Sequence, residues 1–270
     1  MEKQISISMF SKPWKEQSLE ELAELTLKFG FTGIEFPLRD GYQAEPATAE
    51  RTLPEASRVL GGYGVKITSV ASVTDEHIFS ACAMAGVPVI RIMFGNKLEK
   101  DYLEAEADMK RQIEKFLPFC EKYKIKVGIQ QHCGPGINNS MEMLSLLREY
   151  DSNLVGGIWD AAHSGLAGEE PEQALDIIKS HLVLVNFKNA FYKRVNGPEA
   201  YEAKYAHHYT TGRQGLCSWP RAIKHLKKIG FYGNVCLTAE YSDHDNIDKY
   251  VMEDCEYIKL LINDVYGEEF

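Results

Sequence analysis

Residues that can hold a metal or move a proton follow several apolar runs of this chain. The run 154–159 is followed by Asp160 and His163. The same order recurs at three places: the run 126–129 is followed by Gln130, Gln131 and His132, the run 182–185 by Asn186, Lys188 and Asn189, and the run 235–239 by Glu240. A buried strand that stops on an acid or an imidazole delivers polar groups to a face of the fold, because a core excludes them unless they are paired. We therefore interpret the four runs as parallel strands whose ends meet at one shared site.

The segments between these runs have the periodicity of helices. The expected strands cover 5–10, 33–38, 65–70, 87–94, 126–131, 154–160, 182–188 and 234–240. Each is followed by a helical pattern, and the first of these opens on a capping box of Ser18 and Glu21 and stops at Gly30. Strict alternation predicts a parallel sheet covered by helices, and eight units close into a barrel. We expect a single (β/α)8 TIM barrel in one domain, residues 1–270.

One connection is unusually long. The stretch 190–217, roughly 28 residues rich in tyrosine and charge, has no clear periodicity, and such loops are usually lids, binding loops or oligomer contacts. The adjacent His207 and His208 within it resemble a metal pair, but we interpret them as loop histidines. A homo-oligomer is one expectation for this segment.

The bulk composition excludes some functions. A hydrophobic content of 44% and a charged content of 26% are typical of a soluble globular protein. The net charge of −9 argues against nucleic acid as the main partner. No apolar run approaches the roughly 18 residues of a membrane span, and the first residues show no signal-peptide pattern. The six cysteines never form a CxxC pair, so we expect buried free thiols and a cytoplasmic protein.

Four motifs together resemble a known family. They are Gly33-Ile-Glu35, Asp160-Ala-Ala-His163, Gly212-Arg-Gln-Gly215 and the Glu240 that ends the last strand. In this order and at strand ends they are similar to the xylose isomerase-like barrel superfamily, which includes sugar isomerases, ketose epimerases, inosose dehydratases and endonuclease IV. The resemblance covers essentially the whole chain.

The resemblance implies a divalent metal, Mn²⁺, Mg²⁺ or Zn²⁺, held by a Glu, an Asp, a His and a Glu at four strand ends. These positions fall on Gln130, Asp160, Asn186 and Glu240, and a further family Asp falls on Asn189. Two of the four ligands are therefore amides, which lack the charge of a carboxylate and the nitrogen of an imidazole. We expect weak metal binding or none.

The resemblance also implies a carbohydrate substrate and chemistry by proton transfer. Because Gln130 cannot accept a proton, the sequence argues against a two-base epimerisation at the family's positions and leaves a one-base isomerisation, in which Glu240 moves the proton between neighbouring carbons. Lys188, His132 and His163 are the other candidate catalytic residues, through enediolate stabilisation or proton transfer. The candidate substrate-binding residues are Trp14, Glu35, Gln130, Asn189 and Arg213.

Several alternatives stay open at this stage. The site could belong to a lyase or dehydratase of a keto-sugar or inosose, or to a catalytically inactive barrel that binds a carbohydrate. Asp160 and Glu240 could instead form structural salt bridges with Arg91 and Lys188. Trp14 fits a core position as well as a site wall, and Arg213 fits a solvated loop.

Overall fold

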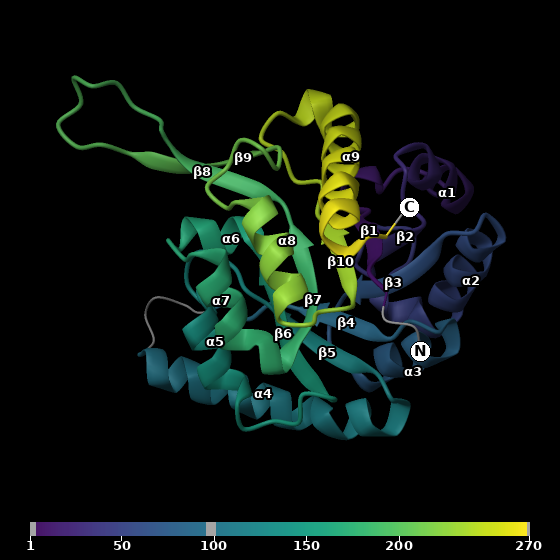
Figure 1. The fold of residues 1–270 in the computed structure, drawn as a ribbon. Coiled ribbons are helices and arrows are strands. Elements are labelled where there is room, and N and C mark those ends of the chain that lie inside the picture. The colour runs from purple at the N-terminus through teal and green to yellow at the C-terminus, as the bar shows by residue number, and fades with distance from the viewer. Residues whose placement is uncertain (1–3, 96–100, 269–270) are drawn as a thin grey trace.

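Eight parallel strands close into a barrel in the computed structural model, which describes residues 4–95 and 101–268 (Figure 1). The barrel strands are β1 (Ser6–Phe10), β2 (Gly33–Pro37), β3 (Lys66–Ala71), β4 (Val89–Ile92), β5 (Lys126–Gln130), β6 (Val155–Asp160), β7 (Leu182–Phe187) and β10 (Asn234–Leu237). Strand β1 pairs with both β2 and β10, so the barrel has no free edge. This confirms the predicted (β/α)8 TIM barrel.

Helices cover the outside of the barrel (Figure 1). They are α1 (Leu19–Lys28), α2 (Ala49–Gly62), α3 (Glu76–Ala85), α4 (Tyr102–Tyr123), α5 (Ser140–Leu147), α6 (Ala161–Leu166), α7 (Pro171–Ile178), α8 (Trp219–Lys228) and α9 (Ile247–Tyr266). Four short 3₁₀ turns lie at Lys12–Trp14, Pro46–Thr48, Lys179–His181 and His244–Asn246. Within the described ranges, no helix combines the length and apolar character that crossing a membrane requires. The first three residues, on which the expectation about a signal peptide depends, lie outside these ranges.

Local sequence signals account for the helix ends. The Ser18 side chain accepts from the backbone N–H of Glu21, and the Glu21 carboxylate accepts from the backbone N–H of Ser18, which confirms the predicted capping box. Gly86 ends α3 in the left-handed region at φ +70°, where a side chain would be strained.

The apolar core has two parts. Most buried side chains lie between the barrel and its helices, where α-helical stripes pack on the outward faces of the strands. A smaller cluster fills the barrel interior, and its buried members are Phe10, Ala71, Ile158, Leu184 and Cys236. Since this cluster closes the barrel below the strand ends, polar side chains gather above it, at the C-terminal mouth. All six cysteines are free and buried, as expected.

The segment expected to be irregular contains an antiparallel hairpin instead. Strand β8 (Asn189–Arg194) follows β7 after one residue and pairs with β9 (Tyr205–Thr210), and the ribbon projects beyond the barrel (Figure 1). Its base is held to the loop after β10 by two hydrogen bonds between Tyr209 and Ser242. Residues 205–210 are aromatic, small and imidazole side chains and do not alternate between apolar and polar types. Strand prediction from hydrophobic alternation therefore missed this strand.

The connection after β6 also differs from expectation. One helix was predicted there, but the short helix α6 begins directly at Ala161 and precedes α7. The Asp160 side chain caps α6 by accepting the backbone N–H of His163 at 3.1 Å. Asp160, the last residue of β6, therefore also fixes the position of His163.

Candidate active site at the barrel mouth

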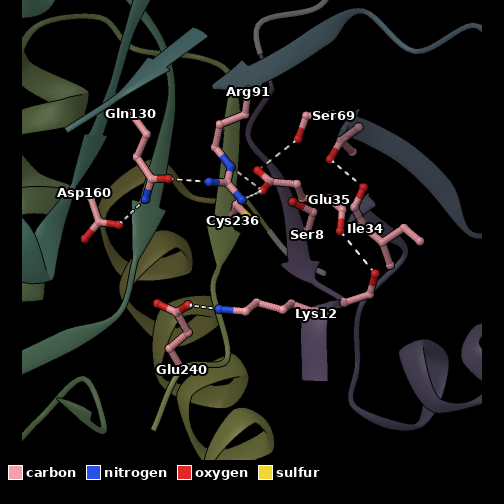
Figure 2. A network of polar contacts seen from close by, with 12 residues as sticks. Ser8, Lys12, Ile34, Glu35, Ser69, Arg91, Gln130, Asp160, Cys236 and Glu240 are labelled. Atoms are coloured by element: carbon pink, nitrogen blue, oxygen red, sulfur yellow. Dashed lines mark hydrogen bonds and ion pairs between the residues drawn. The ribbon is translucent and has the colours of Figure 1, made fainter. Parts of the chain in front are cut away.

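A chain of charged and amide side chains crosses the C-terminal mouth of the barrel (Figure 2). In order of contact it runs through Glu35, Arg91, Gln130, Asp160, Lys188, Glu240 and Lys12. Each of the seven residues lies on, or within three residues after, a different strand of the barrel. The structure thus brings together Gln130, Asp160 and Glu240, which the sequence predicted to share a site.

One end of the chain is an ion pair inside the mouth. The Arg91 guanidinium donates to Glu35 at 2.5 Å, and Ser69 donates to the other Glu35 oxygen at 3.2 Å. Arg91 also donates to the side-chain oxygen of Gln130. Glu35 is fully buried, so its carboxylate is used to hold Arg91, and Arg91 in turn fixes which way the Gln130 amide points. With its oxygen on the guanidinium, the Gln130 nitrogen donates to Asp160 at 2.7 Å.

The other end centres on Lys188. Its ammonium donates to Glu240 at 2.5 Å and lies 3.6 Å from Asp160. Lys12, in the turn after β1, donates to the second Glu240 oxygen at 3.0 Å. Asp160 and Lys188 are buried, whereas 29% of the Glu240 side chain is exposed.

These contacts set the protonation states. Burial alone would lower the pKa of Lys188, but the carboxylates of Asp160 and Glu240 outweigh it and raise that pKa. Burial would raise the pKa of Glu240, but Lys188 and Lys12 hold it well below its ordinary value. Burial raises the pKa of Asp160 in spite of Lys188. At neutral pH Lys188 is therefore an ammonium and Glu240 a carboxylate.

The residues at the family's metal positions do not fit a divalent cation in this arrangement. The Gln130 oxygen, which would be the ligand, faces the Arg91 guanidinium. The Lys188 ammonium lies between the two carboxylates that would hold the ion. Asn186 is buried beside Asp160 in the sheet register, with no hydrogen bond to either polar atom of its side chain. The positive charge that a metal would supply is thus present as Lys188.

Two neighbouring cavities, which share three lining residues, lie at this chain of residues. The outer one has a volume of about 510 Å³, and its lining includes Lys12, Lys15, Tyr42, Tyr209 and His244. The inner one, of about 100 Å³, reaches Arg39, Arg91, Gln130 and Lys188. Both share Lys12, His132 and Glu240.

The lining carries an excess of positive charge. Arg39 lies 5.8 Å from the centre of the Phe10 ring, and its guanidinium forms no hydrogen bond or ion pair with any residue in the described ranges. Burial and the neighbouring Arg91 lower its pKa, as expected for a cation without an acidic partner. Among the described residues that line the two cavities, Glu240 is the one acid.

Three predicted substrate-binding residues lie elsewhere. Trp14 is buried against Phe29 and donates to Asp248 at 3.0 Å. The Arg213 guanidinium stacks on Tyr257 of α9, 3.6 Å from the ring centre. The Asn189 amide is fully buried, and all its hydrogen bonds go to backbone groups of residues 190, 212 and 217. None of the three lines either cavity, so in this conformation they do not face the space where a substrate would bind.

The two candidate catalytic histidines pack against each other behind the mouth. The ring centres of His132 and His163 are 4.1 Å apart. His132 lines both cavities, whereas His163 is fully buried and lines neither. Burial lowers the pKa of His163, so its imidazole is neutral.

The expectation that His207 and His208 are loop histidines is wrong. Both lie on β9, so their side chains leave opposite faces of the ribbon. His207 contacts Cys133 and Tyr192, and His208 packs on Phe191.

Sequence reasoning gave no role at the site to Lys12, Arg39 or Cys133, and it considered Arg91 only as a structural partner of Asp160 and Glu240, whereas Arg91 pairs with Glu35. Arg91 carried a usable signal, because a charge inside the apolar run 87–94 requires a partner when the strand is buried. Lys12 also follows a strand end, like the residues that were selected. Arg39 and Cys133 had no distinguishing pattern, and only the fold shows what faces them.

The sequence matches the model of the xylose isomerase-like TIM barrel family over residues 23–261, so this chain belongs to that family. Solved structures with the same fold include the D-psicose 3-epimerase of Clostridium cellulolyticum H10 with D-tagatose, at a TM-score of 0.72 and 13% identity, covering 95% of this chain and 99% of that one. The probable 3-DHS dehydratase AsbF of Bacillus anthracis superposes with a TM-score of 0.69 at 17% identity, covering 94% and 98%. A xylose isomerase-like TIM barrel protein of Mycobacterium smegmatis in complex with magnesium gives 0.70 at 15% identity, covering 97% of each chain. At these identities the likeness establishes the fold, and no curated protein matches the sequence.

Proposed function

We propose that this protein is an isomerase or epimerase-like enzyme that acts on a small carbohydrate by proton transfer at carbon, at the C-terminal mouth of the barrel. The observation that carries the proposal is the convergence of Glu240 with Lys188 and Lys12 at the shared floor of the two cavities. A carboxylate that can take a proton from carbon, next to ammonium groups that can stabilise an enediolate, is the minimum that such a reaction needs. Family membership, with an epimerase and a probable dehydratase among the structures of the same fold, supports a sugar-modifying enzyme.

The proposed reaction uses one base. Substrate oxygens accept the hydrogen bonds that Lys188 and Lys12 now donate to Glu240, and the pKa of the freed carboxylate then rises toward its ordinary value. Glu240 takes the proton from the carbon next to the carbonyl, and the C–H electron pair forms the enediol double bond. Lys188 gives a proton to the carbonyl oxygen and recovers one from the neighbouring hydroxyl. Glu240 then returns its proton to the adjacent carbon.

The charge of the lining favours an anionic substrate. Arg39, Lys12 and Lys15 line the cavities, and among the described lining residues Glu240 is the one acid that faces these cations. A sugar phosphate or a sugar acid would place its anionic group against the unpaired guanidinium of Arg39. We therefore propose that the substrate carries a phosphate or carboxylate group.

Hydrogen exchange in D₂O tests the proposal. The wild-type protein is incubated with a panel of ketoses, their phosphates and the corresponding sugar acids, without added metal and with chelator. We expect deuterium at the carbon next to the carbonyl for at least one anionic member, and a loss of about 100-fold or more in Glu240→Gln. Glu256→Gln, an exposed residue on α9, is the matched control and should exchange like the wild type.

Three outcomes would contradict the proposal. Loss of water from the substrate instead of exchange would identify a dehydratase. Thermal stabilisation by a panel member without exchange would identify a binding barrel. Exchange that is equal in Glu240→Gln and wild type would remove Glu240 from the reaction.

A further inference from the structure

Beside the mouth lies a cluster of nitrogen and sulfur donors that the proposed reaction does not use as such. His132 and Cys133 follow β5, and His163 lies in α6, with ligand atoms of the three within 4.8 Å of one another. The hairpin adds a fourth donor, because His207 Nδ1 lies 3.7 Å from Cys133 Sγ. Residues from three separate segments thus place donor atoms near the Cys133 thiol.

Two of these donors have free lone pairs. His132 Nδ1 lies 2.8 Å from the carbonyl oxygen of Cys133, and since a carbonyl only accepts, Nδ1 carries the proton and leaves Nε2 with its lone pair. His163 is fully buried, and neither of its ring nitrogens has a hydrogen-bond partner within the described part of the chain. A buried polar group without a partner is costly, so its retention requires an explanation. A ligand shared by the cluster provides one.

The donor types indicate which ligand. Thiolate and imidazole together suit Zn²⁺ far better than Mg²⁺ or Mn²⁺, which prefer oxygen. Tetrahedral bonds of the usual Zn–N and Zn–S lengths place donor atoms about 3.3 to 3.8 Å apart. No two ligand atoms of the triad lie more than 4.8 Å apart, so side-chain rotations that move an atom by about 1 Å would close the site.

The surrounding charges permit a cation. Lys188 lies 5.1 Å from the ring centre of Tyr209, close to the cluster, but its ammonium is paired with Glu240 and lies near Asp160. His163 Nε2 lies 4.0 Å from Asp160 Oδ2, a carboxylate that could orient the ring from behind as it does in many zinc sites. A Cys133 thiolate would supply a further negative charge.

We propose that His132, Cys133, His163 and His207 form a binding site for Zn²⁺ or a similarly soft divalent ion, separate from the carboxylates of the mouth. The ion would join the base of the hairpin to the barrel, and His132 and His163 would act as ligands rather than as proton carriers. This goes beyond the proposed function and uses none of the groups that are essential to it. Either proposal can fail without the other.

Cobalt titration of the purified full-length chain, after removal of metal with a chelator, tests the site. Co²⁺ replaces Zn²⁺ in such sites, and a cysteine ligand gives a thiolate-to-cobalt charge-transfer absorption. We expect one Co²⁺ per chain with this absorption, and its displacement by Zn²⁺. Cys133→Ser should abolish the absorption, and His207→Gln should weaken binding by roughly 10-fold or more.

Two control variants separate this site from others. His208→Gln changes the neighbouring histidine on the opposite face of β9 and should leave the Co²⁺ affinity within about twofold of wild type, a difference under 0.5 kcal/mol. Glu240→Gln should also leave it unchanged. His163→Gln changes a buried side chain and could prevent folding, so the test rests on Cys133→Ser and the exposed His207→Gln, with circular dichroism to check their fold.

Three results would overturn the proposed zinc site. Absence of the charge-transfer absorption in the wild type, or its persistence in Cys133→Ser, excludes the cysteine as a ligand. Loss of binding in Glu240→Gln would place the ion at the mouth instead. Equal weakening by His207→Gln and His208→Gln would indicate nonspecific histidine binding.

Discussion

At the scale of single residues, Lys188 decides what the mouth of this barrel can bind. Its ammonium lies between Asp160 and Glu240, at the place where the family's metal ligands converge. Two unit charges about 4 Å apart interact by about 4 kcal/mol at the effective dielectric of a protein site. A metal ion in the same place would be repelled by the Lys188 ammonium. Metal binding therefore meets two obstacles, this repulsion and the amide side chains at positions 130 and 186.

This gives a prediction for Mn²⁺ affinity. The double variant Gln130→Glu with Asn186→His restores the family's ligand types, and adding Lys188→Met removes the ammonium. We expect the triple variant to bind Mn²⁺ at least about tenfold more tightly than the double variant, equivalent to about 1.4 kcal/mol. Isothermal titration calorimetry measures the difference.

The control for this experiment is a lysine at the rim. Lys15→Met, added to the double variant in place of Lys188→Met, removes an exposed ammonium whose ion pair is with Glu16. It should leave the Mn²⁺ affinity of the double variant unchanged. If the double and triple variants bind Mn²⁺ equally, Lys188 does not compete with a metal.

At the scale of elements, the Asn189 side chain links the base of the hairpin β8–β9 to the connection that precedes α8. Asn189 donates to the carbonyls of Gly212 and Cys217 at 2.9 and 2.8 Å and accepts from the N–H groups of Ala190 and Cys217. Gly215 allows this close approach, because a Cβ there would lie 2.1 Å from the Asn189 oxygen. The motif Gly212-Arg-Gln-Gly215 thus serves to pack the strand-to-helix connection around this amide.

We predict that Asn189→Ala lowers the free energy of unfolding by about 2–3 kcal/mol, because it leaves buried backbone groups without partners. Urea unfolding followed by circular dichroism measures the change. Asn153→Ala, an exposed asparagine bonded to Asp151, is the control and should change stability by less than about 0.5 kcal/mol. A similar small effect of both substitutions would show that Asn189 does not hold the hairpin.

At the scale of the whole molecule, Asp254 links three remote segments. From α9 it accepts the backbone N–H of Gly212 at 2.8 Å and the hydroxyl of Tyr241 at 2.9 Å. Burial raises its pKa to about 6, despite these two donors. Because the unfolded chain ionises this group near its ordinary value of 3.8, the folded state holds the proton more tightly between these two pH values.

The free energy of unfolding is therefore expected to fall as the pH rises from 3.8 to about 6. Where the folded state binds more protons than the unfolded state, the free energy of unfolding decreases with pH. From pH 4.5 to pH 7 we expect the ionisation of Asp254 to lower the free energy of unfolding by about 2 kcal/mol. The variant Asp254→Asn cannot ionise at this position, so its free energy of unfolding should not show this decrease. Urea unfolding of both proteins at the two pH values checks the prediction, and a difference between them that does not change with pH would contradict it.

Most of the architecture could be predicted from local patterns. The apolar runs, the capping box at Ser18 and the glycine at position 86 each determine an element from neighbouring residues alone. Eight such units have few ways to pack other than as a closed barrel. The pattern failed at β9, where stability comes from cross-strand pairs such as Tyr192 with His207 rather than from burial on one face.

The sequence by itself determined the barrel and the meeting of Gln130, Asp160 and Glu240, because strand ends must converge when parallel strands close. Only the tertiary structure decided what those side chains do. The partners of Glu240, Lys12 and Lys188, lie 228 and 52 residues away along the chain, and the nearness of Cys133 to His207 spans 74. Contacts between such remote residues depend on how the elements pack and on which donor reaches which acceptor. A local sequence pattern predicts neither of these.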